Sequence, residues 1–387
     1  MTIGALVLLA APVVVGGIAY VGYPVVLAIL AALKGPSRPW RDPPVWPMIT
    51  VTVPSYNEER SIRDTLERLL AVPYPAGKRH IVVISDASTD GTDGIVREFA
   101  SRGVELVRLP TRRGKTAAEN AAASAIRGEV VVNIDATMRL RPHSLRALVR
   151  VFQDPMVGVA SGRDVSVGSR AAESARGESG YVGFEMWLRS LETRLGSIVG
   201  ASGCFYAIRR HLYDGQFPEQ LSRDFASALV AREHGLRAVS VDDAIVEVPL
   251  AASLQSELQR KTRTMARGLE TLLYKRHLLN PVRYGGFALM LWCHKLCRWL
   301  VYPLLPPALV GLVLLGASSR VAAGAVALSV VGIAVGTAAL MWPRHRVPRV
   351  VSIAGFALAT TVAGILAWTK VLQGERSPTW EPTRRPL

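Results

Sequence analysis

Hydrophobic positions are concentrated at the two ends of the chain. Residues 1–33 contain no charged side chain, and no Asp or Glu lies between Glu270 and Glu375. A helix needs ~20 consecutive apolar residues to cross a bilayer. The first stretch is too long for one upright span and too short for two, which predicts one long or tilted helix. The second stretch predicts three spans, near residues 299–317, 321–342 and 350–369. The pattern therefore predicts an integral membrane protein.

A cleaved signal peptide is the alternative for the first stretch. Such a peptide has a basic start and a shorter apolar region, and this chain has neither. Basic residues follow the first span and separate the last two spans: Lys34, Arg38, Arg41, Arg344, Arg346 and Arg349. Because basic loops stay inside, we expect a multi-pass plasma-membrane protein whose residues 35–298 are cytosolic and whose termini are outside. Arg320 alone separates the other two spans, whereas Arg384 and Arg385 in the tail argue against this topology.

Between the apolar ends, short β-branched runs alternate with helical patterns. This alternation predicts an α/β fold with a mostly parallel sheet that is covered by helices on its faces. The expected strands are Ile49–Pro54, Ile81–Ser85, Val104–Leu109 and Val130–Ile134, and the expected helices are 58–71, 92–101 and 115–127. Ligands of such sheets bind at the carboxyl ends of the strands.

Polar side chains follow these strands. After the first strand, Tyr56 offers a ring for a base and Glu58 offers a carboxylate for ribose hydroxyls. The alternative is a helix start that Ser55 or Asn57 caps. After the second strand come Asp86 and a second acid in a turn that, alternatively, only caps a helix.

Two further motifs carry charge. The run Arg112-Arg113-Gly114-Lys115-Thr116 predicts a basic loop that opens a helix and suits a diphosphate, although a solvated basic turn is the alternative. It lacks the spacing of a P-loop. Asp135 ends the fourth strand, after four residues that are expected to be buried. A divalent cation that bridges this carboxylate to a diphosphate would offset the cost of placing a charge there.

Composition narrows the class of protein. Half of the 387 residues are hydrophobic, which excludes a disordered chain. The net charge of +16 would suit nucleic acid, but the arginines do not alternate with an aromatic stacking platform. We therefore expect anionic lipids and a nucleotide substrate, and no nucleic acid. Three cysteines give no disulfide framework, and Cys293, His294 and Cys297 are expected to pack and not to bind zinc.

The order of these motifs resembles glycosyltransferase family 2, the GT-A type of nucleotide-sugar-dependent enzymes. The resemblance covers about residues 48–276 and extends to the membrane-embedded branch that includes hyaluronan, chitin-oligosaccharide, poly-N-acetylglucosamine and cellulose synthases. It implies that Pro54, Tyr56, Glu58 and Asp86 bind the donor nucleoside and that Lys115 lies near its diphosphate. It implies Asp135 as the first acid of a metal motif that holds Mg²⁺ or Mn²⁺.

The resemblance also assigns the acceptor side. Asp224, in Ser222-Arg223-Asp224-Phe225, is implied as the catalytic base, where relatives usually have two acids. Its alternative role is the N-cap of a helix over Phe225–His234. Gly203 and Cys204 belong to a run of small residues implied beside the acceptor sugar.

Two departures from the family pattern concern the metal and the product. Thr137 replaces the second acid of the metal motif, so one carboxylate and the donor phosphates must hold the ion. Residues Gln259–Thr264 occupy the place of a Gln-x-x-Arg-Trp motif, and Thr264 stands where the Trp would stack on a growing sugar chain. We assign Arg260 and Arg263 to the donor and the later cations to lipid. The stretch Gly180–Leu195 either lines an acceptor path or forms an amphipathic helix below the membrane.

The leading hypothesis is a membrane-embedded inverting glycosyltransferase that moves a sugar from a UDP-sugar to a saccharide or lipid acceptor in polysaccharide synthesis. The enzymatic alternative is a polyprenyl-phosphate or other lipid glycosyltransferase that makes a single transfer. A transporter or scaffold would place charges inside the spans, and the three later spans, as bounded above, contain none. The expected segments are a first membrane helix (1–34), a cytosolic GT-A domain (35–276), an interfacial segment (277–298), three membrane helices (299–373) and a tail (374–387).

Overall fold

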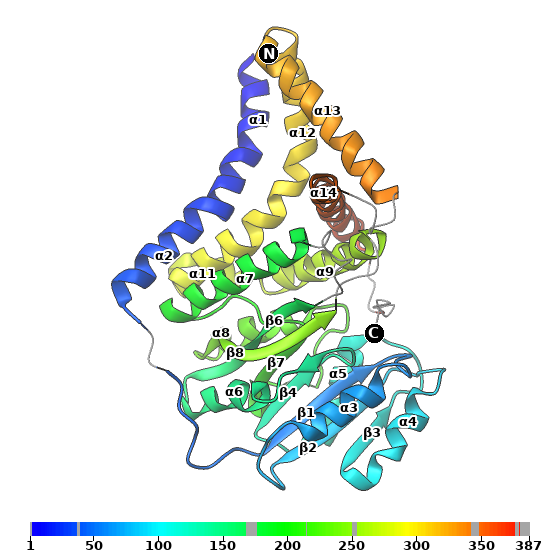
Figure 1. Ribbon diagram of the computed structural model, residues 1–387. Helices are drawn as coiled ribbons and strands as arrows, with labels where there is room; N and C mark the ends of the chain where they lie inside the picture. Colours follow the sequence, from blue (N-terminus) through cyan, green and yellow to red (C-terminus); the bar gives the residue numbers. More distant parts are fainter. Residues whose placement is uncertain are drawn as a thin grey trace. The chain divides into compact units, whose positions relative to one another are not determined.

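The computed structural model describes residues 2–36, 39–167, 176–213, 215–249, 254–341, 348–375 and 379. The described residues pack into two units (Figure 1). The helical unit takes its residues from Met1–Leu30, Gly168–Tyr181 and Ala251–Arg376. The sheet unit takes its residues from Ala31–Val167, Val182–Leu250 and Ser377–Leu387. The five segments predicted from the sequence stay predictions.

An eight-stranded mixed sheet forms the centre of the sheet unit. The strand order is β3-β2-β1-β4-β7-β6-β8-β5. Four pairs, β1 with β2, β1 with β4, β2 with β3 and β6 with β8, are parallel, and β7 and β5 pair antiparallel with their neighbours. The strands are β1 (Ile49–Ser55), β2 (Arg79–Ser85), β3 (Val104–Arg108), β4 (Val130–Ile134), β5 (Arg139–Leu140), β6 (Val157–Val167), β7 (Phe205–Arg209) and β8 (Arg237–Pro249). The predicted α/β class and its four strands are confirmed.

Helices cover both faces of this sheet, as expected for central strands such as β1 and β4, which are buried over their whole length. Alternate residues of one strand reach opposite cores. Val83 packs with α3 (Ile62–Ala71), α4 (Thr92–Glu98) and α6 (Ser144–Arg150), whereas Val82 packs with α5 (Lys115–Ala122). A further core cluster contains Tyr206 of β7 together with apolar residues of α8 (Arg223–Glu233). Short 3₁₀ turns continue several of these elements: η2 (Ala100–Arg102), η3 (Ala123–Ala125), η4 (Val151–Gln153) and η6 (Arg210–Leu212).

The helical unit contains four helices that are long and apolar enough to cross a membrane, among the described residues: Ile3–Lys34, Gly286–Gly316, Arg320–Met341 and Val350–Gln373. The first is α1 (Thr2–Gly17), the π-helical turn η1 (Ile18–Gly22) and α2 (Tyr23–Lys34). The second is α11 (Gly286–Leu291), the π-helical turn η8 (Trp292–Cys297) and α12 (Arg298–Gly316). The others are α13 (Arg320–Met341) and α14 (Arg349–Gln373). One N-terminal and three C-terminal apolar helices are confirmed.

The second apolar helix begins earlier than the sequence predicts. It starts at Gly286 and not near residue 299, because η8 continues the helix through the stretch assigned to an interfacial segment. Lys295 and Arg298 therefore lie inside this longer candidate span, whereas the span predicted near residues 299–317 contains no charge. Arg298 is buried, and its guanidinium lies 5.2 Å from the Tyr20 ring of η1.

The remaining helices of the described residues are α7 (Arg176–Leu195), α9 (Leu254–Tyr274), η7 (Arg276–Leu279) and α10 (Pro281–Tyr284). Helix α7 covers the stretch Gly180–Leu195, and its two alternative roles, an acceptor path or an amphipathic helix below the membrane, stay predictions. On α9 the buried carboxylate of Glu257 accepts two hydrogen bonds from Arg260, at 2.9 and 2.7 Å. Lys261 donates to the Thr360 hydroxyl of α14 at 2.8 Å and lies over the Phe356 ring. These contacts fix α9 on α14.

Gly128 should be the most sensitive glycine of the sheet. A Cβ there would lie 2.5 Å from the backbone of Ile49 and Thr50 in β1. Since backbone atoms of a central strand cannot yield, Gly128→Ala should destabilise the fold by about 1–3 kcal/mol. Gly94→Ala, on α4 with no atom within 4 Å of a new Cβ, is the matched control. The thermal unfolding midpoint of the detergent-solubilised protein should fall only for Gly128→Ala; equal midpoints would contradict this packing.

Candidate active site

The turns after β1 and β2 lie side by side. The strands pair in register up to Ser55 and Ser85, so both chains leave the sheet at the same edge. Asn57 joins the turns: its backbone N–H donates to the Ser88 hydroxyl at 3.2 Å, and its side-chain oxygen accepts the Thr89 N–H at 2.8 Å. Asn57 and Ala87 adopt φ values of 52° and 57°. Left-handed backbone at residues other than glycine is strained, and such strain concentrates at functional sites.

The expected nucleoside-binding residues occupy the first of these turns. Pro54 is buried within β1, and the Tyr56 ring lies 3.9 Å from the Arg112 guanidinium. The Glu58 carboxylate accepts the Ser61 hydroxyl at 2.6 Å. Helix α3 begins only at Ile62 with Ser61 as N-cap, so the alternative in which Ser55 or Asn57 caps the helix is wrong.

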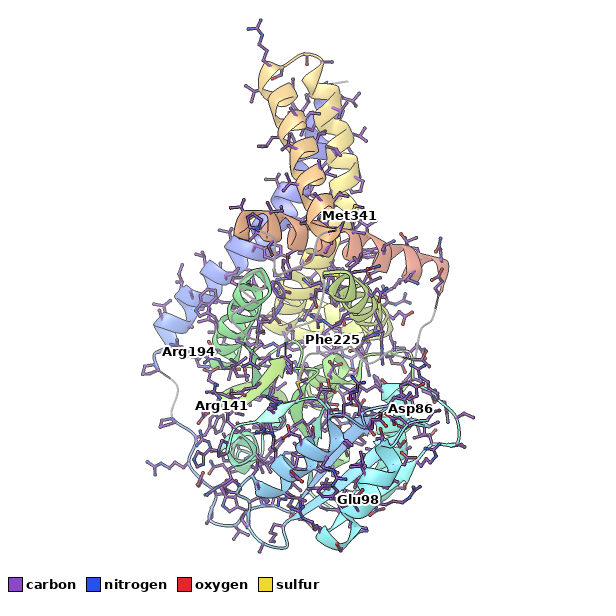
Figure 2. All side chains as sticks on the ribbon, turned by 45° about the vertical axis from the view of Figure 1, so that its right-hand side comes forward. Asp86, Glu98, Arg141, Arg194, Phe225 and Met341 are labelled. Carbon is purple, nitrogen blue, oxygen red and sulfur yellow. The ribbon has the colours of Figure 1, made fainter. Side chains whose placement is uncertain are left out.

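Asp86 fixes the basic loop. Its side chain is fully buried (labelled in Figure 2), and its carboxylate accepts the backbone N–H groups of Arg113 and Gly114, each at 2.8 Å. Hydrogen bonds to an ionised acceptor are about twice as strong as neutral ones. Gly114 has a φ of 103°, which favours glycine, and α5 begins at the next residue. Asp90 accepts the N–H of Thr92, the first residue of α4, at 3.0 Å, whereas Asp86 binds the basic loop.

Lys115 connects the donor side to the acceptor side. Its ammonium donates to the Asp135 carboxylate at 2.5 Å and to the Gly203 carbonyl at 2.8 Å. Burial alone would lower the pKa of Lys115, but the charges of Asp135, Glu119 and Asp224 outweigh it and raise the pKa above its ordinary value. Lys115 is therefore a permanent cation.

Asp224 lies on the other side of the same glycine. A Cβ on Gly203 would be 2.5 Å from its Oδ2 atom, so the carboxylate rests directly on this residue. The N-cap of α8 is Ser222, and Asp224 lies in the first turn, so its alternative role as the N-cap is wrong. The carbonyl of Cys204 accepts the Asp135 N–H at 3.2 Å. Lys115, Asp135, Asp224, Gly203 and Cys204 thus form one cluster, and Asp86 adjoins it through Gly114.

A buried charge pair below the cluster was not predicted. Glu119, one helical turn after Lys115, lies 3.7 Å from Arg223, and both side chains are buried. Burial raises the pKa of Glu119, while the charges of Lys115 and Arg223 oppose that rise. The four-residue spacing from Lys115, and the position of Arg223 beside Asp224, were the signals available in the sequence.

Arg260 and Arg263 lie on α9 in the helical unit. Arg260 binds Glu257 there, as described above, and the assignment of both arginines to the donor stays a prediction.

A single carboxylate is available for the expected metal. Among the described residues, no three His, Cys, Asp or Glu side chains lie close enough to hold an ion. Asp135 is one-third exposed, and Thr137 two residues later brings no charge. One carboxylate fits Mg²⁺ or Mn²⁺ only if substrate phosphates supply further oxygen ligands, which is the usual arrangement for Mg²⁺.

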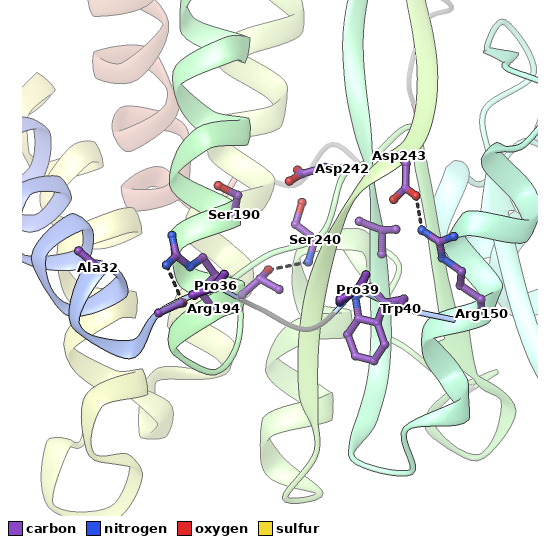
Figure 3. A pocket seen from close by; sticks show the side chains of 13 residues that line it. Ala32, Pro36, Pro39, Trp40, Arg150, Ser190, Arg194, Ser240, Asp242 and Asp243 are labelled. Carbon is purple, nitrogen blue, oxygen red and sulfur yellow. Dashed lines mark hydrogen bonds and ion pairs between the residues drawn. The ribbon is translucent and has the colours of Figure 1, made fainter. Parts of the chain in front are cut away.

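A separate cleft of about 710 Å³ lies elsewhere in the sheet unit (Figure 3). Trp40, Ser240 and Asp242 line it, and none of the motif residues does. Arg194 at its edge donates to the carbonyls of Ala31 and Gly35 at 2.6 and 2.8 Å, which caps the end of α2. The cleft therefore lies between the residues that follow α2 and the end of α7. The cluster around Lys115 is the better candidate site.

Comparison with known proteins shows what this cluster resembles. The profile of Glycosyl transferase family 2 matches residues 50–216, which include every member of the cluster except Asp224. This segment of the chain is similar to glycosyltransferase family 2. An N-acetylglucosaminyltransferase of Mesorhizobium japonicum is 28% identical over 248 residues, 57% of this chain and 57% of that protein. A beta-monoglucosyldiacylglycerol synthase of a Nostoc species is 27% identical over 172 residues, 43% of this chain and 37% of that protein.

A solved structure matches more of this chain. The mannosyltransferase PcManGT from Pyrobaculum calidifontis, in complex with GDP-Man and Mn²⁺, aligns with a TM-score of 0.70 and 25% identity, over 95% of this chain and 100% of that one. By contrast, the chain spans 57% or less of the two curated relatives named above. The chain shares the GT-A fold, and four helices among the described residues are long and apolar enough to cross a membrane.

Gly203→Ala tests the cluster directly. The new methyl group would displace the Asp224 carboxylate, and misplacing a catalytic group by ~1 Å can cost 10²-fold in rate. We expect sugar transfer to fall at least about 10-fold with an unchanged unfolding midpoint. Gly183→Ala on α7, where a Cβ meets no atom within 4 Å, should leave the rate unchanged. Full activity of Gly203→Ala would show that the position of the Asp224 carboxylate does not matter for sugar transfer.

Proposed function

We propose that this protein is a glycosyltransferase that moves a sugar from a UDP-sugar to a saccharide or lipid acceptor at the membrane, with inversion at the anomeric carbon. The observation that carries this proposal is the cluster around Lys115, which donates to both Asp135 and Gly203, while Asp224 lies against Gly203. A diphosphate-binding cation, a metal-binding acid and a proton acceptor are the three groups that the reaction requires.

The departing diphosphate is the first requirement. Negative charge grows on it in the transition state, and Lys115 and the N-terminus of α5 supply positive potential. Lys115 and Asp135 neutralise one another in the structure, and a diphosphate with its cation would offer each a new partner. Mg²⁺ or Mn²⁺, when bound by Asp135 and the phosphates, would add several kcal/mol of charge stabilisation.

The attacking hydroxyl is the second requirement. Asp224 would accept its proton as the sugar moves to the acceptor, and a positioned base typically contributes 10²- to 10⁴-fold. Tyr56 with Arg112, Glu58, and the loop that Asp86 fixes would hold the nucleoside. Gly203 and Cys204 would lie beside the acceptor. The donor role of Arg260 and Arg263 rests on the sequence motif alone.

The acceptor and the product length distinguish two versions of this function. A polysaccharide synthase agrees with three apolar helices after the catalytic segment, and the names of the N-acetylglucosaminyltransferase relatives make N-acetylglucosamine a sugar to test. A single transfer to a lipid agrees with the name of the glycolipid synthase relative and with Thr264 in place of a stacking Trp. The GDP-Man in the PcManGT structure adds a GDP-sugar as a donor to test. The similarity to glycosyltransferases supports an enzyme and gives no support to the transporter or scaffold alternative.

We also propose that the catalytic segment is cytosolic and that the enzyme lies in the plasma membrane. The support is the distribution of basic loop residues described above. Of these residues, Arg38, Arg344 and Arg346 lie outside the described residues.

Asp135→Asn and Asp224→Asn should both lower sugar transfer at least about 100-fold. Asp224→Asn removes the base, whereas Asp135→Asn removes the metal ligand and should also raise the Mn²⁺ concentration needed for half-maximal rate. Asp243→Asn, at an exposed carboxylate on β8, is the control. Release of UDP and transfer of labelled sugar measure both steps. Normal turnover of either variant would remove that residue from the mechanism.

Product length should separate the two versions. Purified enzyme with UDP-N-acetylglucosamine, UDP-glucose or GDP-mannose, offered chito-oligosaccharide, diacylglycerol or undecaprenyl phosphate, should give labelled product with at least one pair. A ladder of oligomers indicates a polymerase, and one labelled lipid indicates the single-transfer enzyme. No transfer from any of the donors would contradict the proposed function.

A further inference from the structure

The carboxylate of Asp164, on β6, contacts the residue that precedes Gly203 in the cluster. Asp164 lies on β6 and is half-buried. Both of its oxygens accept the Ser202 hydroxyl, at 2.6 and 2.9 Å. Ser202 itself is buried and precedes Gly203. The Ser202 side chain therefore connects Asp164 to Gly203, which contacts Lys115 and Asp224.

Ser202 is the first residue of the turn Ser202–Cys204, which we call the acceptor turn, and its hydrogen bonds fix this turn. Its hydroxyl oxygen accepts the Cys204 N–H at 3.1 Å, and its own N–H donates to the Ser161 hydroxyl at 2.8 Å. The next two carbonyls of the turn accept from Lys115 and from the Asp135 backbone, as described above. Three separate elements, β6, α5 and the end of β4, thus fix three consecutive residues.

The surroundings of Asp164 make a carboxylate costly at this position. Burial raises its pKa, the Ser202 hydrogen bond and the Arg189 charge oppose that rise, and the charges of Asp135 and Glu185 add to it. Arg189 and Glu185 form a buried ion pair on α7, and Arg189 also donates to the Ser161 hydroxyl at 3.3 Å. If this position served only to fill space, an apolar residue would do so at lower cost, but an apolar residue could not accept the Ser202 hydroxyl.

We propose that Asp164 is a positioning residue for sugar transfer: through Ser202 it orients the acceptor turn, and thereby sets where the acceptor hydroxyl lies relative to Asp224. This inference rests on the proposed function. It names a hydrogen-bond acceptor, and not a charge, as the property that matters. The donor contacts of Tyr56, Arg112 and Asp86 do not pass through Ser202, so donor binding should be independent of Asp164.

Three variants test the inference in the full-length, detergent-solubilised enzyme. Asp164→Ala removes the acceptor of the Ser202 hydroxyl, and Ser202→Ala removes the hydroxyl. Each should lower labelled-sugar transfer at least about 10-fold, while the Kd for UDP with Mn²⁺, measured by calorimetry, changes less than about 3-fold. Asp164→Asn keeps an oxygen that accepts the hydroxyl, so transfer should stay within about 3-fold of the parent enzyme. Asp243→Ala, at the exposed acid on β8, is the control.

The outcomes are distinct. Unchanged transfer by Asp164→Ala would overturn the inference and leave the proposed function intact. Asp164→Asn as defective as Asp164→Ala would also overturn it, because charge and not the hydrogen bond would then matter. Weakened UDP binding equal to the loss of transfer, or a fallen unfolding midpoint, would show a merely structural role. A parent enzyme that transfers from none of the donors would overturn the proposed function and this inference with it.

Discussion

The ammonium group of Lys115 is the contact on which the site depends. It joins the end of β4, through Asp135, to the acceptor turn, through Gly203, and it does so from the first residue of α5. Three segments that are distant in sequence are held by one cation. Without it, the carboxylates of Asp135 and Asp224 would lose the cation that both of their charges stabilise. The same cation is the group best placed for a diphosphate, so stability and chemistry rest on one side chain.

Buried polar groups surround this contact, and each is connected to another group. Asp86 accepts two backbone N–H groups, Glu119 faces Arg223, and Asp164 accepts the Ser202 hydroxyl. A buried charge is expensive unless it is paired and hydrogen-bonded. Burying these groups lowers the free energy of unfolding, and their hydrogen bonds fix the positions of turns and not of helices or strands. Since the turns carry the functional groups, this rigidity prepares the site before substrates arrive.

The helical unit also buries polar side chains, His294 and Arg298. The first two candidate spans each include a π-helical turn, and these turns bring Tyr23 to 6.3 Å from His294 and Tyr20 beneath Arg298. A π-helical turn inserts an extra residue and shifts the faces of the helix on either side. Arg298 and His294 are thereby buried against aromatic rings instead of facing lipid. The two spans are held together by polar contacts as well as by apolar packing.

The sequence by itself determined the apolar helices, the four leading strands, and the order of Tyr56, Asp86, Lys115 and Asp135 at their carboxyl ends. Those features follow from local periodicity and from the rule that parallel strands end at one edge, so the chain records them position by position. Only the tertiary structure decided that Asp86 supports a loop, that Asp224 rests on Gly203, and that Asp164 reaches the acceptor turn. It also decided that the second span continues through His294 and Arg298. These facts depend on contacts between segments far apart in the chain, or on a helix that continues through the polar residues of a π-helical turn, and local periodicity contains no information about either.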